Sequence, residues 1–386
     1  MELLYVSPFW PQKSGISEYS ETLVWGLIKY FSMTILTKKS KISNIKVKSK
    51  FKVLKYSAQN DYSIYDIIIY NFGNSPSNHD YMYDMLIAFP GYIIMHDFSL
   101  YYLMTKVYSD KNEFFRQIYY QEKINTFIRV KDIIKEKKEY NLLDLKELAA
   151  DVPLNREIIL KAKGIFVHSE YTKNLIRNIS NTKVCKIDLV NCIPELSGQF
   201  SELQIKKKYG FKNNDFVIGS VGLIAPSKQN KIICETIKNY NKTHNIPIKY
   251  IMIGEGDYIN EYLDENIVKT DFVHNDEFFS TIDCCDLIFN LRYPYNGESS
   301  ASLIQCLYKG KHCVVTDIGW FSELPDSCVE KVPVLVSEEM IMNICKKHMG
   351  NKRKNEVGKK YVIENCDRNI IAKKIKNFIC NDIKNE

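Results

Sequence analysis

The sequence predicts an α/β protein made of two similar halves, each built on a mostly parallel β-sheet. Short runs of apolar and β-branched residues alternate with longer helical patterns, which is typical of βαβ units. The alternation starts again near residue 216. The chain has 386 residues, more than one hydrophobic core usually serves, so two domains are expected.

In the first half, the alternation starts with a strand over residues 3–6. A loop with Pro8, Pro11 and Gly15 leads into a helix over residues 17–30. The remaining apolar runs predict further strands at 33–37, 65–70, 92–95 and 164–167. Before the last of these strands, a segment rich in Tyr and Lys predicts a mostly helical insertion over about 100–160.

The second half repeats this plan, with a strand over 216–222 and a helix from about Lys228. Three more strands are expected at 248–253, 286–291 and 312–316, with a helix from about Ser299 and a final helix over 368–384. We expect an N-terminal domain over 1–195, a C-terminal domain over 196–367 and a last helical segment over 368–386. Ligands usually bind in the cleft between two such halves.

Composition narrows the function classes. The net charge is +7, too mild for a dedicated nucleic-acid-binding protein. Two interpretations stay open: a solvated surface rich in lysine, or a basic surface that faces nucleotide phosphates, acidic glycans or anionic lipid. The eleven cysteines show no zinc-ligand spacing. They indicate reduced thiols, and without a signal peptide or a long apolar run we expect a cytoplasmic protein.

A candidate phosphate site begins at Gly297, in the segment that follows the strand at 286–291. The segment Gly-Glu-Ser-Ser-Ala-Ser opens a helix, whose free N–H groups and partial positive charge suit a diphosphate. Ser300, Ala301 and Ser302 are small enough to let phosphate oxygens approach. Glu298 can accept hydrogen bonds from sugar hydroxyls, although Glu298 and Ser299 can also be ordinary capping residues.

Three further residues follow strands in the same way. Lys228 can pair with a phosphate and stabilise a departing diphosphate, or it can be a surface lysine. Gly15 permits close backbone approach to a phosphate. His96 ends the strand at 92–95 and is either a polar active-site group or a structural histidine.

Several motifs are absent from the sequence. It has no Asp-x-Asp triplet, the carboxylate pair with which many sugar transferases hold a divalent metal, so we expect a reaction without a catalytic metal or other cofactor. It also lacks the glycine-rich dinucleotide fingerprint, the P-loop and the nucleophile elbow. Nicotinamide enzymes, P-loop NTPases and α/β-hydrolases are therefore disfavoured.

Taken together, these segments resemble the retaining glycosyltransferases of family four, which have the GT-B fold. The strongest match runs from Asn290 to Leu303 and continues over Thr316–Pro325. Other matching segments appear in family order, at Ser7–Ser17, Tyr70–Asn74, Met95–Phe98, Val167–Glu170 and Gly222–Lys228. The resemblance implies two Rossmann-like domains that face each other across a cleft, with the last helix packed back on the N-terminal domain.

The resemblance also implies roles for individual residues. Lys228 and the N–H groups of Ser300, Ala301 and Ser302 would hold the donor phosphates, with Gly15 approaching from the N-terminal domain. Glu298 would contact the donor sugar, as the first glutamate of the family's E-x7-E motif. His96 would lie near the reacting sugar. On the N-terminal domain, Asn74 and Asp97 are expected to bind the acceptor.

The chain departs from the family pattern at two positions. Cys306 stands where the second glutamate of E-x7-E is expected, which puts ribose recognition in doubt. Leu223 stands where an arginine often precedes the lysine by five residues. Arg292 is the candidate that would supply the missing positive charge at the donor site.

We therefore expect a retaining glycosyltransferase that moves a sugar from a nucleotide-diphosphate sugar to a glycan acceptor in bacterial surface-polysaccharide or glycoconjugate synthesis. Two alternatives stay open: a non-hydrolysing nucleotide-sugar epimerase, and an inactive glycan- or nucleotide-binding protein. No nucleic-acid partner is expected.

The insertion contains an amphipathic, basic helical pattern over about 124–138. Phe127, Ile128 and Ile134 alternate there with Lys131, Lys135, Lys137 and Lys138. It is either a helix packed on its domain with a solvated basic face, or a membrane-surface helix. In the second case the protein is peripheral at the inner face of the membrane, and a lipid-linked glycan is the expected acceptor.

Overall fold

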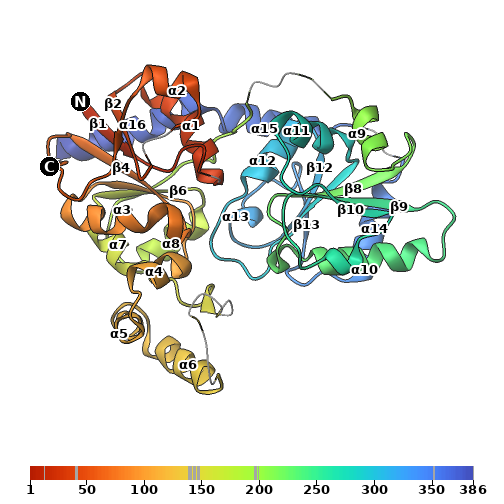
Figure 1. The fold of residues 1–386 in the computed structure, drawn as a ribbon, viewed down its shortest axis with the longest axis horizontal. Coiled ribbons are helices and arrows are strands. Elements are labelled where there is room, and N and C mark those ends of the chain that lie inside the picture. Colours follow the sequence, from red (N-terminus) through yellow and green to blue (C-terminus); the bar gives the residue numbers. More distant parts are fainter. Residues whose placement is uncertain are drawn as a thin grey trace. The chain divides into compact units, whose positions relative to one another are not determined.

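The computed structural model describes residues 1–12, 14–39, 42–137, 141, 145, 148–194, 198, 200–350 and 353–385. The chain divides into two compact units (Figure 1). The N-terminal unit comprises Met1–Val190, Asn296–Ser299 and Asp367–Glu386, and the C-terminal unit comprises Asn191–Tyr295 and Ser300–Cys366. The short segment Asn296–Ser299 thus belongs to the N-terminal unit although its sequence neighbours do not.

The N-terminal unit is built on a parallel sheet of seven strands in the order β3-β2-β1-β4-β5-β6-β7. The strands are β1 Glu2–Val6, β2 Ser32–Thr37, β3 Lys52–Lys55, β4 Ile67–Phe72, β5 Tyr92–Met95, β6 Gly164–Val167 and β7 Val184–Lys186. Every residue of β4, β5 and β6 is buried. Helices cover both faces of such a sheet, which is why its central strands read as continuous apolar runs.

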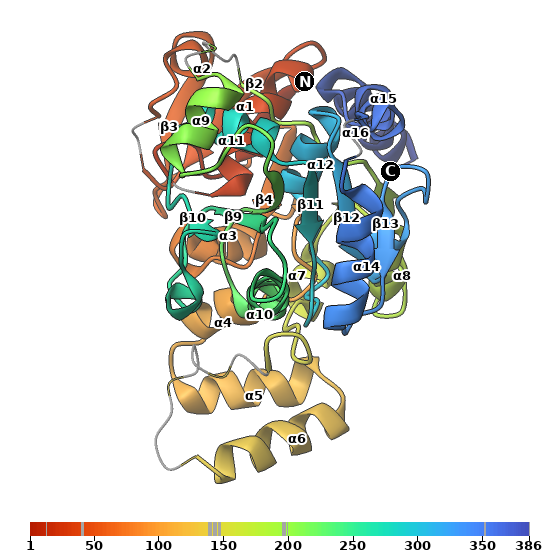
Figure 2. The ribbon, with the colours of Figure 1, turned by 90° about the vertical axis from the view of Figure 1, so that its right-hand side faces the viewer.

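The helices of this unit are α1 Gly15–Leu27, α2 Ile45–Lys50, α3 Pro76–Ala88, α4 Tyr101–Val107, α5 Lys111–Gln121, α6 Ile124–Lys135, α7 Arg156–Lys161, α8 Glu170–Arg177 and α16 Arg368–Asn385. The last helix packs on α1: a Cβ at Gly26 would lie 2.5 Å from the carbonyl oxygen of Arg368. The expectation that the C-terminal helix returns to the N-terminal domain is confirmed. Helices α5 and α6 extend beyond α4, away from the sheet (Figures 1 and 2).

The C-terminal unit is built on a parallel sheet of six strands in the order β10-β9-β8-β11-β12-β13. The strands are β8 Phe216–Val221, β9 Ile248–Ile253, β10 Ile267–Lys269, β11 Leu287–Asn290, β12 His312–Thr316 and β13 Glu330–Val332. Its helices are α9 Glu202–Lys208, α10 Asn230–Asn241, α11 Asn275–Cys284, α12 Ala301–Tyr308, α13 Gly319–Ser322, α14 Glu338–His348 and α15 Glu356–Asn365, with 3₁₀ turns η3 Pro226–Lys228 and η4 Asn260–Tyr262.

Three helix starts differ from the prediction. The helix expected over 17–30 begins at Gly15 and ends at Leu27. The helix expected from about Lys228 begins at Asn230, because Pro226–Lys228 form a 3₁₀ turn and Gln229 has a φ of +54°. The helix expected from about Ser299 begins at Ala301, where the Ser300 side chain caps it. The last two shifts place Lys228 at the end of a 3₁₀ turn and Ser300 at the N-cap of α12.

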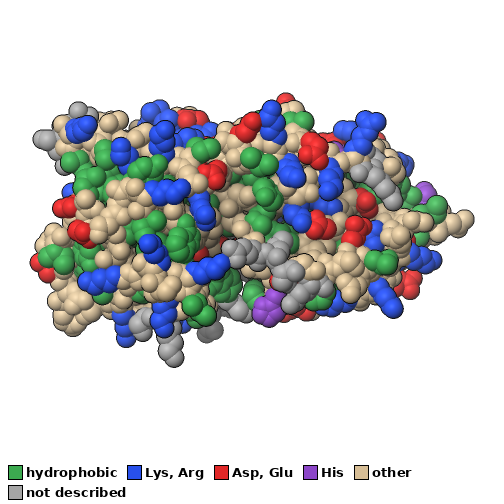
Figure 3. Space-filling model, turned by 90° about the horizontal axis from the view of Figure 1, so that it is seen from above, with side chains coloured by type: hydrophobic (Ala, Val, Ile, Leu, Met, Phe, Trp, Pro, Cys, Tyr) green, Lys and Arg blue, Asp and Glu red, His purple; other side chains and the backbone are tan. Residues whose placement is uncertain are grey.

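The distribution of surface charge and the state of the cysteines are those of an ordinary globular protein. On the face drawn in Figure 3, basic and acidic side chains are interspersed, so the positive charge is not gathered into one patch there. All eleven cysteines are free thiols. Among the described residues, no helix combines the length and the apolar character that crossing a bilayer requires.

Candidate active site

The candidate residues of the C-terminal unit lie in the segments that follow the carboxyl ends of β8 and β11, two neighbouring strands. Lys228 is only 8% exposed. Its Nζ donates a hydrogen bond to the carbonyl oxygen of Val221, the last residue of β8. Gly222 has a φ of +93°, and a Cβ there would lie 2.8 Å from this Nζ and 3.7 Å from Ser302 Oγ. The fold therefore brings the lysine ammonium group to the start of α12.

A hydrogen-bonded cluster holds the first turn of α12. The Oγ of Ser300 accepts from the Leu303 N–H at 3.2 Å and faces Asn290 Oδ1 at 3.3 Å. The amide of Asn290 donates to Ser302 Oγ at 3.4 Å. The first N–H groups of a helix have no acceptor within the helix, and here the Ser300 side chain accepts from that of Leu303. A helix start of this kind next to a lysine is a suitable environment for phosphate oxygens.

Arg292 lies in the loop that follows β11. Its N–H donates to Thr316 Oγ1 at 2.9 Å, and its Nη1 donates to the Leu291 carbonyl oxygen at 3.1 Å. The guanidinium carbon lies 5.9 Å from the centre of the Phe321 ring. These contacts hold Arg292 at the carboxyl edge of the sheet, and its proposed compensation for the missing arginine stays a prediction.

The two departures from the family pattern have different surroundings. Leu223 is 67% exposed, so an apolar side chain stands in solvent directly after Gly222. Cys306 is fully buried, and burial raises the pKa of its thiol well above its usual value, as does the neighbouring Cys313. Cys306 therefore lies in the core of the unit, and position 306 supplies no carboxylate for a ligand.

In the N-terminal unit, His96 lies in a cluster of rings at the end of β5. Its Nδ1 is 3.3 Å from His168 Nε2, and its Nε2 is 3.4 Å from Asn71 Oδ1. The edge of the Tyr19 ring contacts His96, with ring centres 4.6 Å apart. Burial lowers the pKa of His96 well below its usual value, and the neighbouring His168 and His79 act in the same direction. His96 is therefore a neutral imidazole at pH 7.

Asn74 and Asp97, the predicted acceptor residues, bond to each other. The backbone N–H of Asn74 donates to Asp97 Oδ2 at 2.9 Å, and Asn74 Oδ1 accepts from the Leu103 N–H in α4 at 3.1 Å. The loops after β4 and β5 are thus held together beside His96. These contacts give both residues a structural role, and their contact with an acceptor stays a prediction.

Glu298 lies on the short segment that belongs to the N-terminal unit. The Ser99 N–H donates to the Asn296 carbonyl oxygen at 3.0 Å, and Thr172 Oγ1 donates to the Gly297 carbonyl oxygen at 3.4 Å. Glu298 Oε2 accepts from the Asn296 N–H at 2.8 Å. The segment that carries Glu298 is therefore fixed against the loop that follows His96.

Gly15 is exposed at the first position of α1, which Ser14 caps through a hydrogen bond to the Ile16 N–H of 3.2 Å. A Cβ at Gly15 would meet no described atom within 4 Å. The fold itself therefore does not require glycine here, which leaves room for the predicted approach of a ligand.

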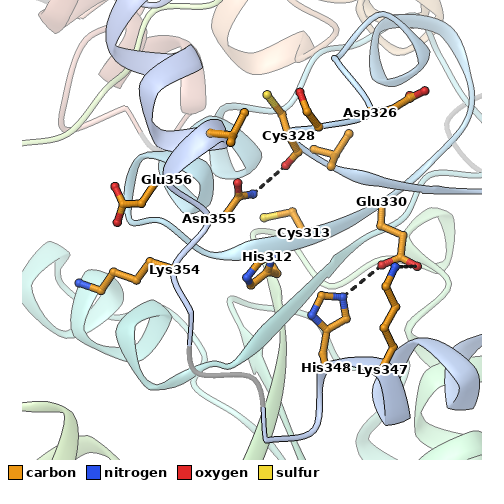
Figure 4. A pocket seen from close by; sticks show the side chains of 13 residues that line it. His312, Cys313, Asp326, Cys328, Glu330, Lys347, His348, Lys354, Asn355 and Glu356 are labelled. Atoms are coloured by element: carbon orange, nitrogen blue, oxygen red, sulfur yellow. Dashed lines mark hydrogen bonds and ion pairs between the residues drawn. The ribbon is translucent and has the colours of Figure 1, made fainter.

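One pocket of about 520 Å³ lies elsewhere, in the C-terminal unit (Figure 4). His312 and Glu330 line it, and they are the first residues of β12 and β13. His348 Nε2 lies 3.1 Å from Glu330 Oε2 in its wall. The pocket is therefore at the amino ends of the strands, whereas parallel sheets bind ligands at the carboxyl ends.

No group of three or more His, Cys, Asp and Glu side chains within the described part of the chain is arranged to hold a metal ion. The metal-free reaction stays a prediction.

The sequence motifs missed three residues that the structure places beside the candidates: Asn71, His168 and Asn290. The matching segment Val167–Glu170 contains His168, but nothing in its spacing indicates that its ring contacts His96.

No family model matches the chain, and no curated protein matches its sequence. Solved structures do match its fold. Sucrose-phosphate synthase from Thermosynechococcus elongatus is 11% identical, with a TM-score of 0.67 and full coverage of both chains. HepE from Anabaena in complex with UDP-glucose is 13% identical, with a TM-score of 0.63 over 99% of this chain and 100% of HepE.

A third similar structure is WaaG, a glycosyltransferase involved in lipopolysaccharide biosynthesis. It is 10% identical, with a TM-score of 0.57 over 98% of this chain and 99% of WaaG. With two parallel-sheet units and neighbours of this kind, the chain has the GT-B fold of glycosyltransferases. The predicted fold class is confirmed.

Proposed function

We propose that this protein is a retaining glycosyltransferase that takes a hexose from a nucleotide-diphosphate sugar without a catalytic metal. One observation carries the proposal. Lys228 Nζ, Gly222 and the first turn of α12 lie close together at the carboxyl edge of the C-terminal sheet. The known structures with this fold include HepE with UDP-glucose, which supports a nucleotide sugar as the ligand.

In this proposal the chain's own residues stabilise the leaving group. Lys228 and the N–H groups of Ala301 and Ser302 would bind the developing charge on the diphosphate. Glu298 and the neutral His96 would orient the donor sugar. The departing phosphate would help to deprotonate the acceptor hydroxyl on the same face of the sugar, which retains the anomeric configuration.

A thermal-shift experiment tests the donor site. UDP, GDP, ADP and their sugar conjugates are added to the protein in the presence of EDTA. A ligand that binds only the native state raises the melting temperature, and we expect a rise with one nucleotide family. The Lys228→Ala variant should lose this rise. A rise that requires a divalent metal would contradict the metal-free proposal, and no rise with any nucleotide would contradict the donor site.

Product analysis with the nucleotide sugar that binds then separates the functions. A free nucleotide and a new glycoside support transfer. Binding without turnover would instead support the inactive nucleotide-binding protein, which the exposed Leu223 and the buried Cys306 favour as the second candidate. Retention is read from the anomeric configuration of the new glycoside.

We propose that the acceptor is a glycan and that the transfer belongs to the synthesis of a bacterial surface polysaccharide or glycoconjugate. The protein would act in the cytoplasm. If it binds the membrane surface, the acceptor would be a lipid-linked glycan. The helix α6 carries part of the predicted basic pattern, and Lys138 lies outside the described residues. Phe127 and Ile134 pack against the core, as the domain-packed interpretation requires. Other apolar side chains of α5 and α6 remain exposed, namely Tyr119, Tyr120, Ile124 and Ile128.

These exposed side chains next to lysines predict weak binding to anionic membranes. We expect the protein to float with vesicles that contain anionic lipid, and Ile128→Glu together with Tyr120→Glu to reduce flotation. The matched control is Ile246→Glu, which changes an exposed isoleucine of the C-terminal unit. Absence of flotation by the unaltered protein would contradict the membrane contact.

A further inference from the structure

Two histidines form a chain of hydrogen bonds between a backbone carbonyl and an amide side chain. His168 Nδ1 lies 3.2 Å from the Ile187 carbonyl oxygen, and its Nε2 lies 3.3 Å from His96 Nδ1. His96 Nε2 in turn faces the Asn71 side chain at 3.4 Å. His168, Asn71 and Ile187 are buried, and only His96 is partly exposed. A ligand would therefore reach this chain at His96.

The Ile187 carbonyl determines which atom donates and which accepts in each hydrogen bond between the histidines and their neighbours. A carbonyl oxygen only accepts, so His168 must carry its proton on Nδ1. Burial lowers the pKa of His168 to about 4, which keeps the ring neutral and leaves a lone pair on Nε2. That lone pair must accept from His96, so His96 carries its proton on Nδ1. In a neutral ring, His96 Nε2 is then the acceptor.

Asn71 completes the chain with its amide group. Its Oδ1 faces His96 Nε2 in the structure, and its buried Nδ2 has no hydrogen-bond partner among the described residues. With Oδ1 in this place, both ends of the hydrogen-bond chain are acceptors. Two neutral imidazoles supply only two N–H groups for its three hydrogen bonds, so one hydrogen bond lacks a proton. A half-turn of the amide about the Cβ–Cγ bond brings Nδ2 to His96 Nε2 and satisfies every bond of the chain.

We propose that His168 is a positioning residue that holds His96 in the Nδ1–H tautomer, so that His96 Nε2 accepts a hydrogen bond from a hydroxyl of the bound sugar. The hydroxyl would take the place of the Asn71 amide hydrogen. The Tyr19 ring makes T-shaped contacts with both imidazoles, with ring centres 4.6 and 5.6 Å apart, and its packing limits their rotation. The hydrogen bond between His96 and a sugar hydroxyl rests on the proposed function. The tautomer of His96 rests only on the hydrogen bonds within the structure.

The test is nitrogen NMR of the full chain labelled at its histidines, without ligand at pH 7. Long-range proton–nitrogen spectra distinguish protonated from unprotonated ring nitrogens, and the His96→Phe variant assigns the signals. We expect both His96 and His168 to carry their proton on Nδ1. A proton on Nε2 of His96, or a doubly protonated ring, would overturn the proposal whether or not the protein transfers sugar.

Substitutions at position 168 then test the positioning role. In His168→Phe, His96 loses its acceptor and both tautomers should appear, whereas in His168→Gln the Oε1 atom takes the place of Nε2 and the tautomer should be kept. Buried His79, changed to Phe, is the matched control and should leave the His96 tautomer unchanged, because His79 does not bond to the His96 ring among the described contacts. We expect kcat to fall about tenfold in His168→Phe, equivalent to about 1.4 kcal/mol, and to recover in His168→Gln.

The affinity for the free nucleoside diphosphate should not change in either variant at position 168, because His96 is assigned to the sugar. An unchanged tautomer in His168→Phe would overturn the positioning role. A correct tautomer in a protein that transfers no sugar would count against the proposed function only.

Discussion

Lys228→Ala should lower kcat for sugar transfer about 100- to 1,000-fold, the range found when one preorganised donor is removed from a developing charge. The ammonium group is held at the start of α12 by the Val221 carbonyl and by the absence of a side chain at Gly222. It is only 8% exposed, and a charge interacts more strongly where little water screens it. The measurement is steady-state transfer with saturating donor.

Two variants separate the charge from the packing. Lys228→Met keeps an aliphatic stem in the buried position and removes only the ammonium group, so it should lose as much activity as the alanine variant while the melting temperature stays close to that of the unaltered protein. Lys231→Ala is the matched control, since Lys231 is an exposed lysine of α10. Rates near normal in Lys228→Met would refute the role of the ammonium group in leaving-group stabilisation.

The sequence predicts the central strands of both sheets well. The strands β5, β6, β9 and β12 have the predicted bounds, because strands buried on both faces are continuous apolar runs between turn residues. Edge strands such as β7 Val184–Lys186 and β13 Glu330–Val332 were missed. They are three residues long, and β7 is only partly buried, so neither length nor hydrophobicity distinguishes them from loops.

The candidate phosphate site was also accessible from sequence, since a helix start after a strand and a nearby lysine are local signals. Its positive-φ Gly222, which brings Lys228 and Ser302 together, is not such a signal. The histidine chain depends on contacts between residues 72 positions apart. Similarly, the capping of α4 by Asn74 comes from the loop after another strand. Spacing within one segment cannot predict such pairs.

The burial of three histidines predicts that the N-terminal unit loses stability in mild acid. Burial lowers the pKa of His79 and of His168 to about 4, and that of His96 well below its usual value. In the unfolded chain each histidine binds a proton below about pH 6.5. Between these values the unfolded state holds more protons, so the free energy of unfolding falls as the pH decreases from about 6.5 toward 4.

The size of the effect follows from the same shifts. At pH 5, His79 and His168 should each cost about 2 kcal/mol relative to pH 7.5. The half-buried Glu21 and Glu122 have raised pKa values, mainly through desolvation, and stabilise the fold when protonated. Their contribution has the opposite sign to that of the histidines, so the histidine part is read from the difference between the unaltered protein and its histidine variants.

Urea unfolding of a Trp320→Phe protein measures this loss in the right unit, because the remaining tryptophans, Trp10 and Trp25, both belong to the N-terminal unit. The free energy of unfolding should fall by at least about 4 kcal/mol between pH 7.5 and pH 5, because His79 and His168 contribute about 2 kcal/mol each and His96 adds to the loss. In His168→Gln the fall should be about 2 kcal/mol smaller, since one buried base no longer titrates on unfolding. The exposed His244→Gln should leave the fall unchanged. A stability that does not depend on pH in this window would mean that the histidines already bind protons in the folded protein, and His96 could then not act as a neutral acceptor.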